Sequence, residues 1–246
     1  IPALIGIGLR FLVPESPLYL LRLGKLGQAK AVLDQILVAN GKTKLGANVS
    51  LVSSAPPSQA GIFSTDLRQR SLMILAIWFL VSVSYYGVFT WLPPRLAGEG
   101  FGFVRGYGFL VFLALAQVPG YALAAYGVEK WGRRPTLIGF CLLSALACLL
   151  FVIAGTPTLI GASLLIMSFA LLGTWGALYA LTPKLYPTAS PATGMGMAGA
   201  MARLGGLLAP SLMGLLVERS FGLAIGIFAG LLAAAAVAAF LVGAET

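Results

Sequence analysis

Aromatic side chains with polar tips recur at helical spacing inside the long apolar runs of this 246-residue sequence. In the first complete run, Trp78, Ser82, Tyr85 and Phe89 follow one another at intervals of three or four residues, with Tyr86 beside them. Such rings stack on planar molecules and their polar atoms form hydrogen bonds, so one helix face could bind a small molecule. Packing inside a helical bundle is the alternative role for each ring. Two later runs repeat the pattern, at Gln117 and Tyr121 and at Trp175, Tyr179 and Thr182.

Arg203 is the only charged residue that falls inside an apolar run rather than near its end. An Arg at the centre of an isolated membrane helix costs about 2.5–3.5 kcal/mol, so Arg203 should face a bundle interior or extend toward the nearer membrane surface. We place it about a third of the way along its run, which favours the second arrangement over pairing with an anionic substrate. All seven acidic residues lie in loops or at the ends of runs, so we expect no proton-relaying carboxylate at mid-membrane.

The composition excludes several classes of protein. Apolar residues make up 59% and charged residues 9%, whereas soluble domains carry about 25% charged residues. So much apolar surface excludes a soluble domain, a disordered chain and a nucleic-acid-binding protein. The sequence has no His and no catalytic pair, so we expect neither an enzyme nor a bound cofactor or metal. Cys141 and Cys148 are expected to be packing residues.

Apolar runs long enough to cross about 30 Å of hydrocarbon divide the chain. Residues 1–13 are expected to be the end of a truncated helix and residues 244–246 a truncated tail, so we expect a fragment of a longer chain. Residues 14–70 form the one long polar loop, with an amphipathic helix predicted at 18–39 and a flexible linker at 40–61. The six-helix membrane domain, residues 71–243, is predicted to have spans at about 71–94, 106–128, 136–155, 158–182, 194–217 and 221–243.

The basic residues predict the orientation of the chain. Twelve of the 16 Lys and Arg residues lie on the side of the long loop, three lie on the opposite side, and Arg203 lies within a run. Because Lys and Arg collect in cytoplasmic loops, the long loop and the C-terminus should be cytoplasmic and the protein should lie in the inner membrane of a cell. The same rule explains the net charge of +9 without an anionic macromolecular partner.

Three loop motifs accompany these runs. They are Pro14–Lys25 (PESPLYLLRLGK), Glu129–Pro135 (EKWGRRP) and Pro183–Thr188 (PKLYPT). Together, and in this order, they resemble the C-terminal half of the major facilitator superfamily, in particular its sugar-porter-like branch and the bacterial metabolite:proton symporters related to niacin and aromatic-acid carriers. The resemblance implies an all-α membrane protein: the six-helix C-terminal bundle of a twelve-helix fold, with the end of the sixth helix and the central cytoplasmic loop before it.

The resemblance also implies a function. That function is secondary active transport of a small metabolite, an aromatic or carboxylic acid or a sugar, by alternating access and coupled to protons. The lipid bilayer and a missing N-terminal six-helix half are the implied partners. Two alternatives remain open: an exporter of drugs or solutes from the same superfamily, and a non-transporting membrane scaffold or sensor that kept the fold.

The resemblance assigns two groups of residues. A cytoplasmic gate of charged groups and one tight turn would consist of Glu15, Glu129, Lys130, Gly132, Arg133, Arg134 and Arg203. A substrate cavity near mid-membrane would be lined by Ser82, Tyr85, Tyr86, Gln117, Trp175 and Tyr179. Helix capping is the alternative role of the motif around Glu15. The chain has Lys184 where the family usually has Glu and Pro191 where it often has Arg, so either the gate is weakened or its partner charges have changed as well.

Overall fold

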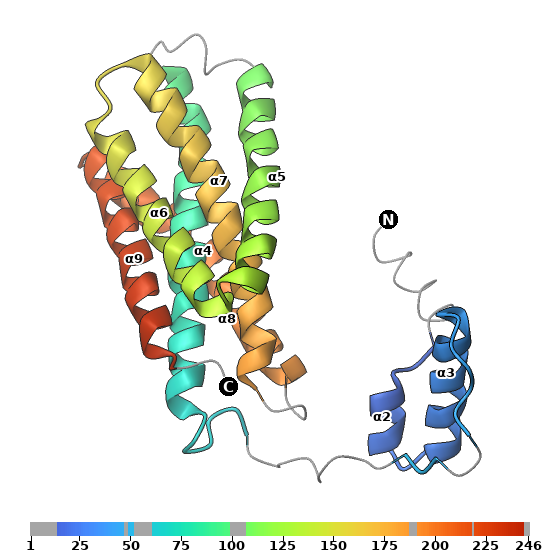
Figure 1. The fold of residues 1–246 in the computed structure, drawn as a ribbon. Helices are drawn as coiled ribbons and strands as arrows, with labels where there is room; N and C mark the ends of the chain where they lie inside the picture. Colours follow the sequence, from blue (N-terminus) through green and yellow to red (C-terminus); the bar gives the residue numbers. More distant parts are fainter. Residues whose placement is uncertain are drawn as a thin grey trace. The chain divides into compact units, whose positions relative to one another are not determined.

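The computed structural model describes residues 14–46, 49–51, 61–98, 107–186, 191–217 and 219–243. The chain divides into two compact units, residues 1–58 and residues 59–246. All the regular secondary structure within the described ranges is helical, as the sequence predicts (Figure 1).

Among its described residues, the smaller unit has two helices where the sequence predicts one over 18–39. Instead of a continuous helix over 18–39, α2 (Pro17–Arg22) ends before Gly24 and α3 (Leu26–Ala39) begins after it. The physical reason is the backbone at Gly24, whose φ of +73° is favourable for glycine and incompatible with an α-helix. The two short helices then pack on each other, so the prediction of a single amphipathic helix is wrong.

Part of the segment predicted to be a flexible linker is attached to α3. The Asp34 carboxylate accepts a 2.8 Å hydrogen bond from the backbone N–H of Leu45, and the Lys30 ammonium donates a 2.9 Å bond to the carbonyl of Gly46. The chain up to Gly46 therefore returns along α3 rather than leaving it. Most of the remaining predicted linker, residues 52–60, lies outside the described residues.

The described part of the larger unit is a bundle of six long helices, each apolar enough to cross a membrane. Every predicted span corresponds to one of them, and every boundary agrees with the prediction to within four residues. The agreement follows from the length of the apolar runs, which is the strongest signal in the sequence. The helices are α4 (Arg68–Gly98), α5 (Tyr107–Lys130), α6 (Arg133–Ile153), α7 (Pro157–Leu181), α8 (Pro191–Val217) and α9 (Phe221–Leu241).

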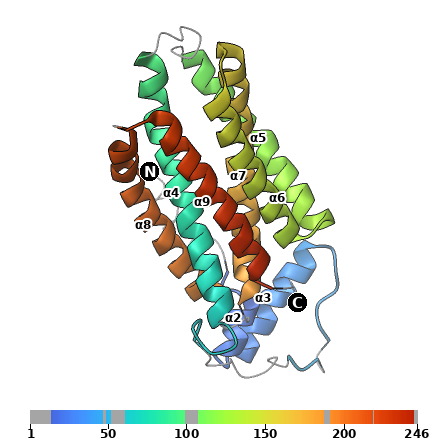
Figure 2. The same ribbon diagram turned by 90° about the vertical axis from the view of Figure 1, so that its left-hand side faces the viewer.

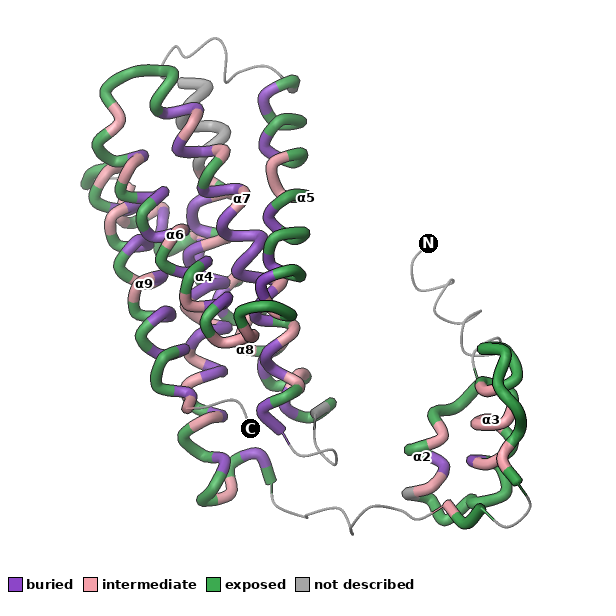
Figure 3. The backbone as a smooth tube through the Cα atoms, viewed as in Figure 1, coloured by how far each residue is buried: buried purple, intermediate pink, exposed green. Residues whose placement is uncertain are grey.

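The six helices form an arc in which α5 and α8 are the two ends. From one end to the other, α5 packs on α7, α7 on α6, α6 on α9, α9 on α4 and α4 on α8 (Figures 1 and 2). The end helices α5 and α8 are the least buried of the six, and Figure 3 shows the exposed side of α5 along its whole length. The bundle therefore has four well-covered helices between two end helices that keep an apolar side uncovered.

Small residues allow the neighbouring helices of the bundle to approach closely. A Cβ on Gly120 of α5 would lie 2.2 Å from the backbone oxygen of Phe169 of α7, and a Cβ on Gly173 would overlap the ring of Phe140. Close backbone approach of this kind is how membrane helices associate, because burying apolar surface gives little advantage in lipid. Cys141 is also fully buried in this core as a free thiol.

Candidate functional site

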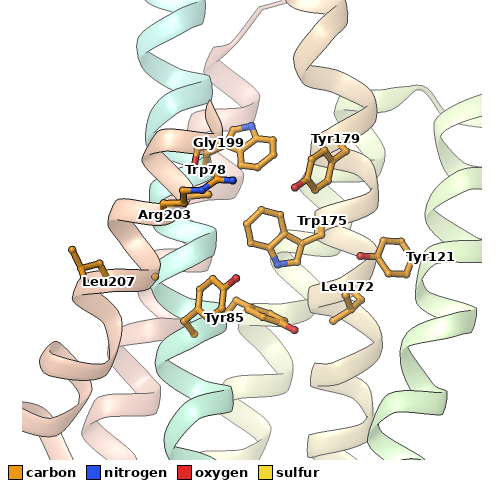
Figure 4. Close-up of a pocket in the computed structure, with 12 residues that line it drawn as sticks. Trp78, Tyr85, Tyr121, Leu172, Trp175, Tyr179, Gly199, Arg203 and Leu207 are labelled. Atoms are coloured by element: carbon orange, nitrogen blue, oxygen red, sulfur yellow. Dashed lines mark hydrogen bonds between the residues drawn. The ribbon is translucent and has the colours of Figure 1, made fainter. Parts of the chain in front are cut away.

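A cavity of about 660 Å³ opens between the end helices of the arc and the two helices that support them (Figure 4). Its volume is in the range of small-molecule binding sites. It is lined by α4 residues Trp78, Tyr85 and Tyr86, by α5 residue Tyr121, by α7 residues Leu172, Trp175 and Tyr179, and by α8 residues Gly199, Ala202, Arg203, Gly206 and Leu207.

Aromatic rings form one wall of the cavity. Trp78 and Tyr179 meet edge to face with their ring centroids 4.8 Å apart, and Trp78 and Trp175 meet at 5.4 Å. Tyr85 continues the wall, with its ring centroid 6.0 Å from that of Trp175 and 5.2 Å from that of Tyr86. The predicted cavity residues Tyr85, Tyr86, Trp175 and Tyr179 therefore lie together, on two helices that are far apart in the sequence.

The aromatic wall is fixed at its base by a hydrogen bond between two helices. The indole Nε1 of Trp78 donates a 2.9 Å bond to Oγ1 of Thr182, the first residue of the 3₁₀ helix η1 (Thr182–Leu185) that follows α7. Both side chains are buried, with Trp78 only 1% exposed. Because its one donor is satisfied, Trp78 presents its ring rather than its N–H to the cavity.

Arg203 brings the only charged side chain among the described residues that line the cavity. Its guanidinium donates a 3.1 Å hydrogen bond to the carbonyl of Gly199 and points toward the aromatic wall in Figure 4. The 27-residue helix α8 begins at Pro191 rather than at 194, so Arg203 lies close to the middle of the helix and not a third of the way along. The apolar run predicted a later start because hydropathy does not register proline as a helix-starting residue. Proline is favoured at the first turn of a helix, and α8 accordingly begins at Pro191.

Two predicted cavity residues form interhelical hydrogen bonds and do not line the cavity. Ser82 is fully buried and donates a 2.5 Å bond to the carbonyl of Ala202, which joins α4 to α8. The Gln117 amide donates a 3.3 Å bond to the hydroxyl of Ser168, which joins α5 to α7. Each lies on the same helix as a ring that does line the cavity, but it is turned toward the neighbouring helix.

The α8 side of the cavity contains residues that the sequence analysis did not select. Gly199, Ala202 and Gly206 lie on the same face of α8 as Arg203, at helical spacing from it. Glycines within a membrane helix are most often explained by close helix packing, which hides such a face in the sequence. The spacing from Arg203 was the signal that could have identified this face, because a charged residue in a membrane helix faces the bundle interior or a water-filled cavity.

Most of the residues predicted to form a gate lie at the end of α5, in the α5–α6 turn or at the start of α6. Glu129 and Lys130 are exposed at the end of α5, and only Trp131 and Gly132 separate α5 from α6. Gly132 has a φ of +94°, which explains the need for glycine in this turn. The sequence places Arg133 and Arg134 in the turn as well, but they form the first turn of α6.

The Arg134 side chain caps the C-terminus of α9. Its guanidinium donates from Nε to the carbonyl of Ala239 at 3.1 Å and from Nη2 to the carbonyl of Phe240, and it lies 5.0 Å from the centre of the Phe240 ring. Carbonyl groups at the C-terminus of α9 have no intrahelical partner, and a cation is favoured there. The side chain therefore joins the start of α6 to the end of α9.

The predicted gate residue Glu15, and the two positions at which the chain departs from the family pattern, lie in other parts of the chain. Glu15 is exposed and precedes α2 in the smaller unit. Lys184 is exposed within η1, and Pro191 is the first residue of α8. The described acidic residues, which are Glu15, Asp34, Asp66 and Glu129, are not among those that line the cavity.

The chain belongs to the sugar (and other) transporter family, whose model matches residues 1–246. This confirms the resemblance to the sugar-porter-like branch of the major facilitator superfamily, and the six-helix bundle agrees with a C-terminal half of that fold. The protein is therefore a multi-pass membrane protein of a family that transports small solutes.

The chain is also similar to individual proteins along most of its length. The chain is 38% identical to the niacin transporter NiaP of Acinetobacter baylyi over 200 residues, which cover 80% of this chain and 46% of the relative. It is 30% identical to a solute carrier family 22 member 15-like protein of Xenopus laevis, over 85% of this chain and 44% of the relative. A synaptic vesicle 2-related protein of Xenopus laevis is 29% identical over 100% of this chain and 49% of its own length. The chain spans about half the length of these relatives.

Proposed function

We propose that this chain is the C-terminal half of a carrier that moves a small planar aromatic carboxylate across the cell membrane by alternating access. The observation that carries the proposal is the position of Arg203. Its guanidinium is the one charge among the described residues of a cavity that is otherwise lined by aromatic and small side chains. A guanidinium pairs with a carboxylate through two parallel hydrogen bonds, and the rings beside it suit a flat molecule.

The energetics of Arg203 support an anionic ligand. A cation near mid-membrane is expensive unless it lines a hydrated cavity or meets an anion. The single described hydrogen bond of the Arg203 side chain, to the carbonyl of Gly199, uses one of its five N–H groups. A carboxylate would use two more donors and neutralise the charge. The niacin transporter of Acinetobacter baylyi, a relative of this chain, is named for a solute of this kind, a pyridine carboxylate.

The uncovered helices support a second six-helix half as the partner. α5 and α8 have an apolar side that the other described helices of the bundle leave uncovered, and large side chains on it are widely exposed: Val118 is 65% exposed, Leu207 is 73% and Leu215 is 68%. Both helices also border the cavity, so a partner that covers them would close it. Residues 1–246 reconstituted alone are therefore expected to show no uptake, whereas the full-length carrier should show it.

We further propose that protons drive the transport. The described acidic residues do not line the cavity, so the carboxylate that takes up the proton would belong to the N-terminal half. The distribution of Lys and Arg supports a cytoplasmic position for the end of the bundle that carries the α5–α6 turn, together with the long loop and the end of α9.

Uptake of labelled nicotinate into liposomes that contain the full-length carrier tests the proposal. Wild-type protein should accumulate nicotinate when the outside is more acidic than the inside. Arg203→Met should abolish the uptake, and Arg219→Met should not, because Arg219 lies exposed in the turn between α8 and α9. Uptake that is unchanged in Arg203→Met, or absent from the wild type for every aromatic carboxylate, would overturn the proposal.

A further inference from the structure

We infer that the main-chain carbonyl of Gly206 accepts a hydrogen bond from those transported molecules that carry a suitable donor. The carrier would then bind aromatic carboxylates with a hydrogen-bond donor on the side of the ring away from the carboxylate more tightly than those without one, such as nicotinate. The inference rests on the proposed function, because it names a second contact in the same cavity. It makes the backbone of α8, and not only the side chain of Arg203, a determinant of specificity.

Pro210 leaves a polar group of α8 without its usual partner. Proline lies inside this helix and has no N–H, so the carbonyl of Gly206, four residues earlier, does not receive the α-helical hydrogen bond that position 210 would otherwise donate. Gly206 is half-buried and lines the cavity. A carbonyl at membrane depth that lacks its helical partner is tolerated where another helix, water or a ligand can supply a donor.

Two donors of α4 near this part of α8 are used elsewhere. The indole N–H of Trp91 donates a 3.1 Å bond to the carbonyl of Pro210 itself, and the hydroxyl of Ser82 donates to the carbonyl of Ala202. Gly206 has no side chain of its own, and the ring of Tyr86 packs against it, since a Cβ there would lie 3.0 Å from that ring. A molecule stacked on the Tyr86 ring would thus meet this part of α8 directly.

The distance between Arg203 and the acceptor sets the shape of the ligand. The guanidinium of Arg203 bonds the carbonyl of Gly199, so its charge lies toward the start of the helix from Arg203. Gly206 follows Gly199 by seven residues, which is about 10 Å along the helix axis at 1.5 Å per residue. A benzene or pyridine ring with its carboxylate at the guanidinium and its donor at a meta or para position spans most of this distance. A donor at the ortho position would instead bond the carboxylate of its own ring.

The test compares two ligands of nearly equal size. 4-Aminobenzoate and 4-methylbenzoate differ in having a donor or a methyl group at the far end of the ring. The full-length wild-type carrier should bind 4-aminobenzoate about three- to tenfold more tightly, as one neutral hydrogen bond allows. In Pro210→Ala the new N–H should occupy the Gly206 carbonyl, and the two affinities should become equal within a factor of about two.

Pro119→Ala is the matched control. Pro119 also lies inside a membrane helix, α5, and the carbonyl that it leaves without a helical partner belongs to Leu115, which is not among the residues that line the cavity. This variant should keep the wild-type preference. A ligand-side control, 4-(dimethylamino)benzoate, has the nitrogen but no N–H, and the wild type should bind it no more tightly than 4-methylbenzoate even if Pro210→Ala cannot be purified.

The outcomes separate this inference from the proposed function. Equal binding of 4-aminobenzoate and 4-methylbenzoate to the wild type would overturn the inference and leave the proposed function standing. A preference that survives in Pro210→Ala, or that is lost equally in Pro119→Ala, would overturn it as well. Failure of the wild type to bind benzoate, 4-methylbenzoate and nicotinate would count against the proposed function, on which the inference depends.

Discussion

Trp78 of α4 and Thr182 at the end of α7 are joined by a 2.9 Å hydrogen bond from the indole Nε1 to Oγ1. The same hydroxyl donates a 2.7 Å bond to the carbonyl of Leu178, so its hydrogen and its acceptor site are both used. Trp78 lines the cavity, and Thr182 marks the point at which α7 becomes a 3₁₀ helix. The bond therefore connects the aromatic wall to the end of the helix that carries Trp175 and Tyr179.

Thr182→Val should destabilise the bundle and loosen the cavity wall. Valine has the same shape but leaves the buried indole N–H of Trp78 without an acceptor, which costs about 1–3 kcal/mol. Thermal unfolding of the purified full-length carrier in detergent measures the change. Thr182→Ser keeps the hydroxyl and should unfold close to the wild-type temperature. Equal unfolding temperatures for the valine variant and the wild type would contradict the role given to this bond.

Gly120→Ala should disrupt the packing of α5 on α7. The added Cβ would lie 2.2 Å from the backbone oxygen of Phe169, and a backbone atom cannot move aside without separating the helices. Overpacking of this kind costs about 1–3 kcal/mol or more. The yield and unfolding temperature of the purified carrier report the effect. Gly230→Ala in α9 is the control, because a Cβ there meets nothing within 4 Å and should change neither value.

Arg134→Ala should destabilise the protein by removing the cap of α9. The guanidinium holds the carbonyls of Ala239 and Phe240, and hydrogen bonds to a charged group contribute about 1.5–3 kcal/mol. Lys130→Ala, at the exposed end of α5, should leave the unfolding temperature unchanged. A purely gating role for Arg134 would have the opposite signature: altered transport rates with wild-type stability.

Ser82→Ala should lower stability without changing the affinity for a carboxylate. The hydroxyl is buried and bonded to the carbonyl of Ala202, so its loss weakens the contact between α4 and α8. Unfolding temperature and ligand affinity are measured on the same preparation. A large loss of affinity with wild-type stability would instead support the direct substrate contact that the sequence suggests for this residue.

The six membrane helices could be predicted from the sequence because each depends on one local property, a run of apolar residues long enough to cross the membrane. The break at Gly24 and the start of α6 at Arg133 could not, because they depend on single backbone angles at Gly24 and Gly132. Hydropathy is insensitive to such angles. The motifs predicted the family correctly, since three of them in order are far more specific than any one.

The cavity was predicted only in part, for a geometric reason. Spacing shows which residues share a helix face, but the rotation of each helix is set by its neighbours in space. Tyr85 therefore lines the cavity while Ser82, one turn away, bonds to α8. The role of Gly206 was hidden because its polar group belongs to the backbone and depends on Pro210, four residues later.

Binding of benzoate and benzamide to wild-type carrier and to Arg203→Met tests the central claim most directly. The two ligands share a ring, and only benzoate carries a charge at neutral pH. If Arg203 pairs with the substrate carboxylate, benzoate should bind about 10- to 100-fold more weakly to Arg203→Met, while the affinity for benzamide should hardly change. The affinity of Arg203→Lys for benzoate should fall between those of the wild type and of Arg203→Met, because an ammonium keeps the charge but not the paired hydrogen bonds. Equal losses for benzoate and benzamide, or no loss for benzoate, would contradict the account.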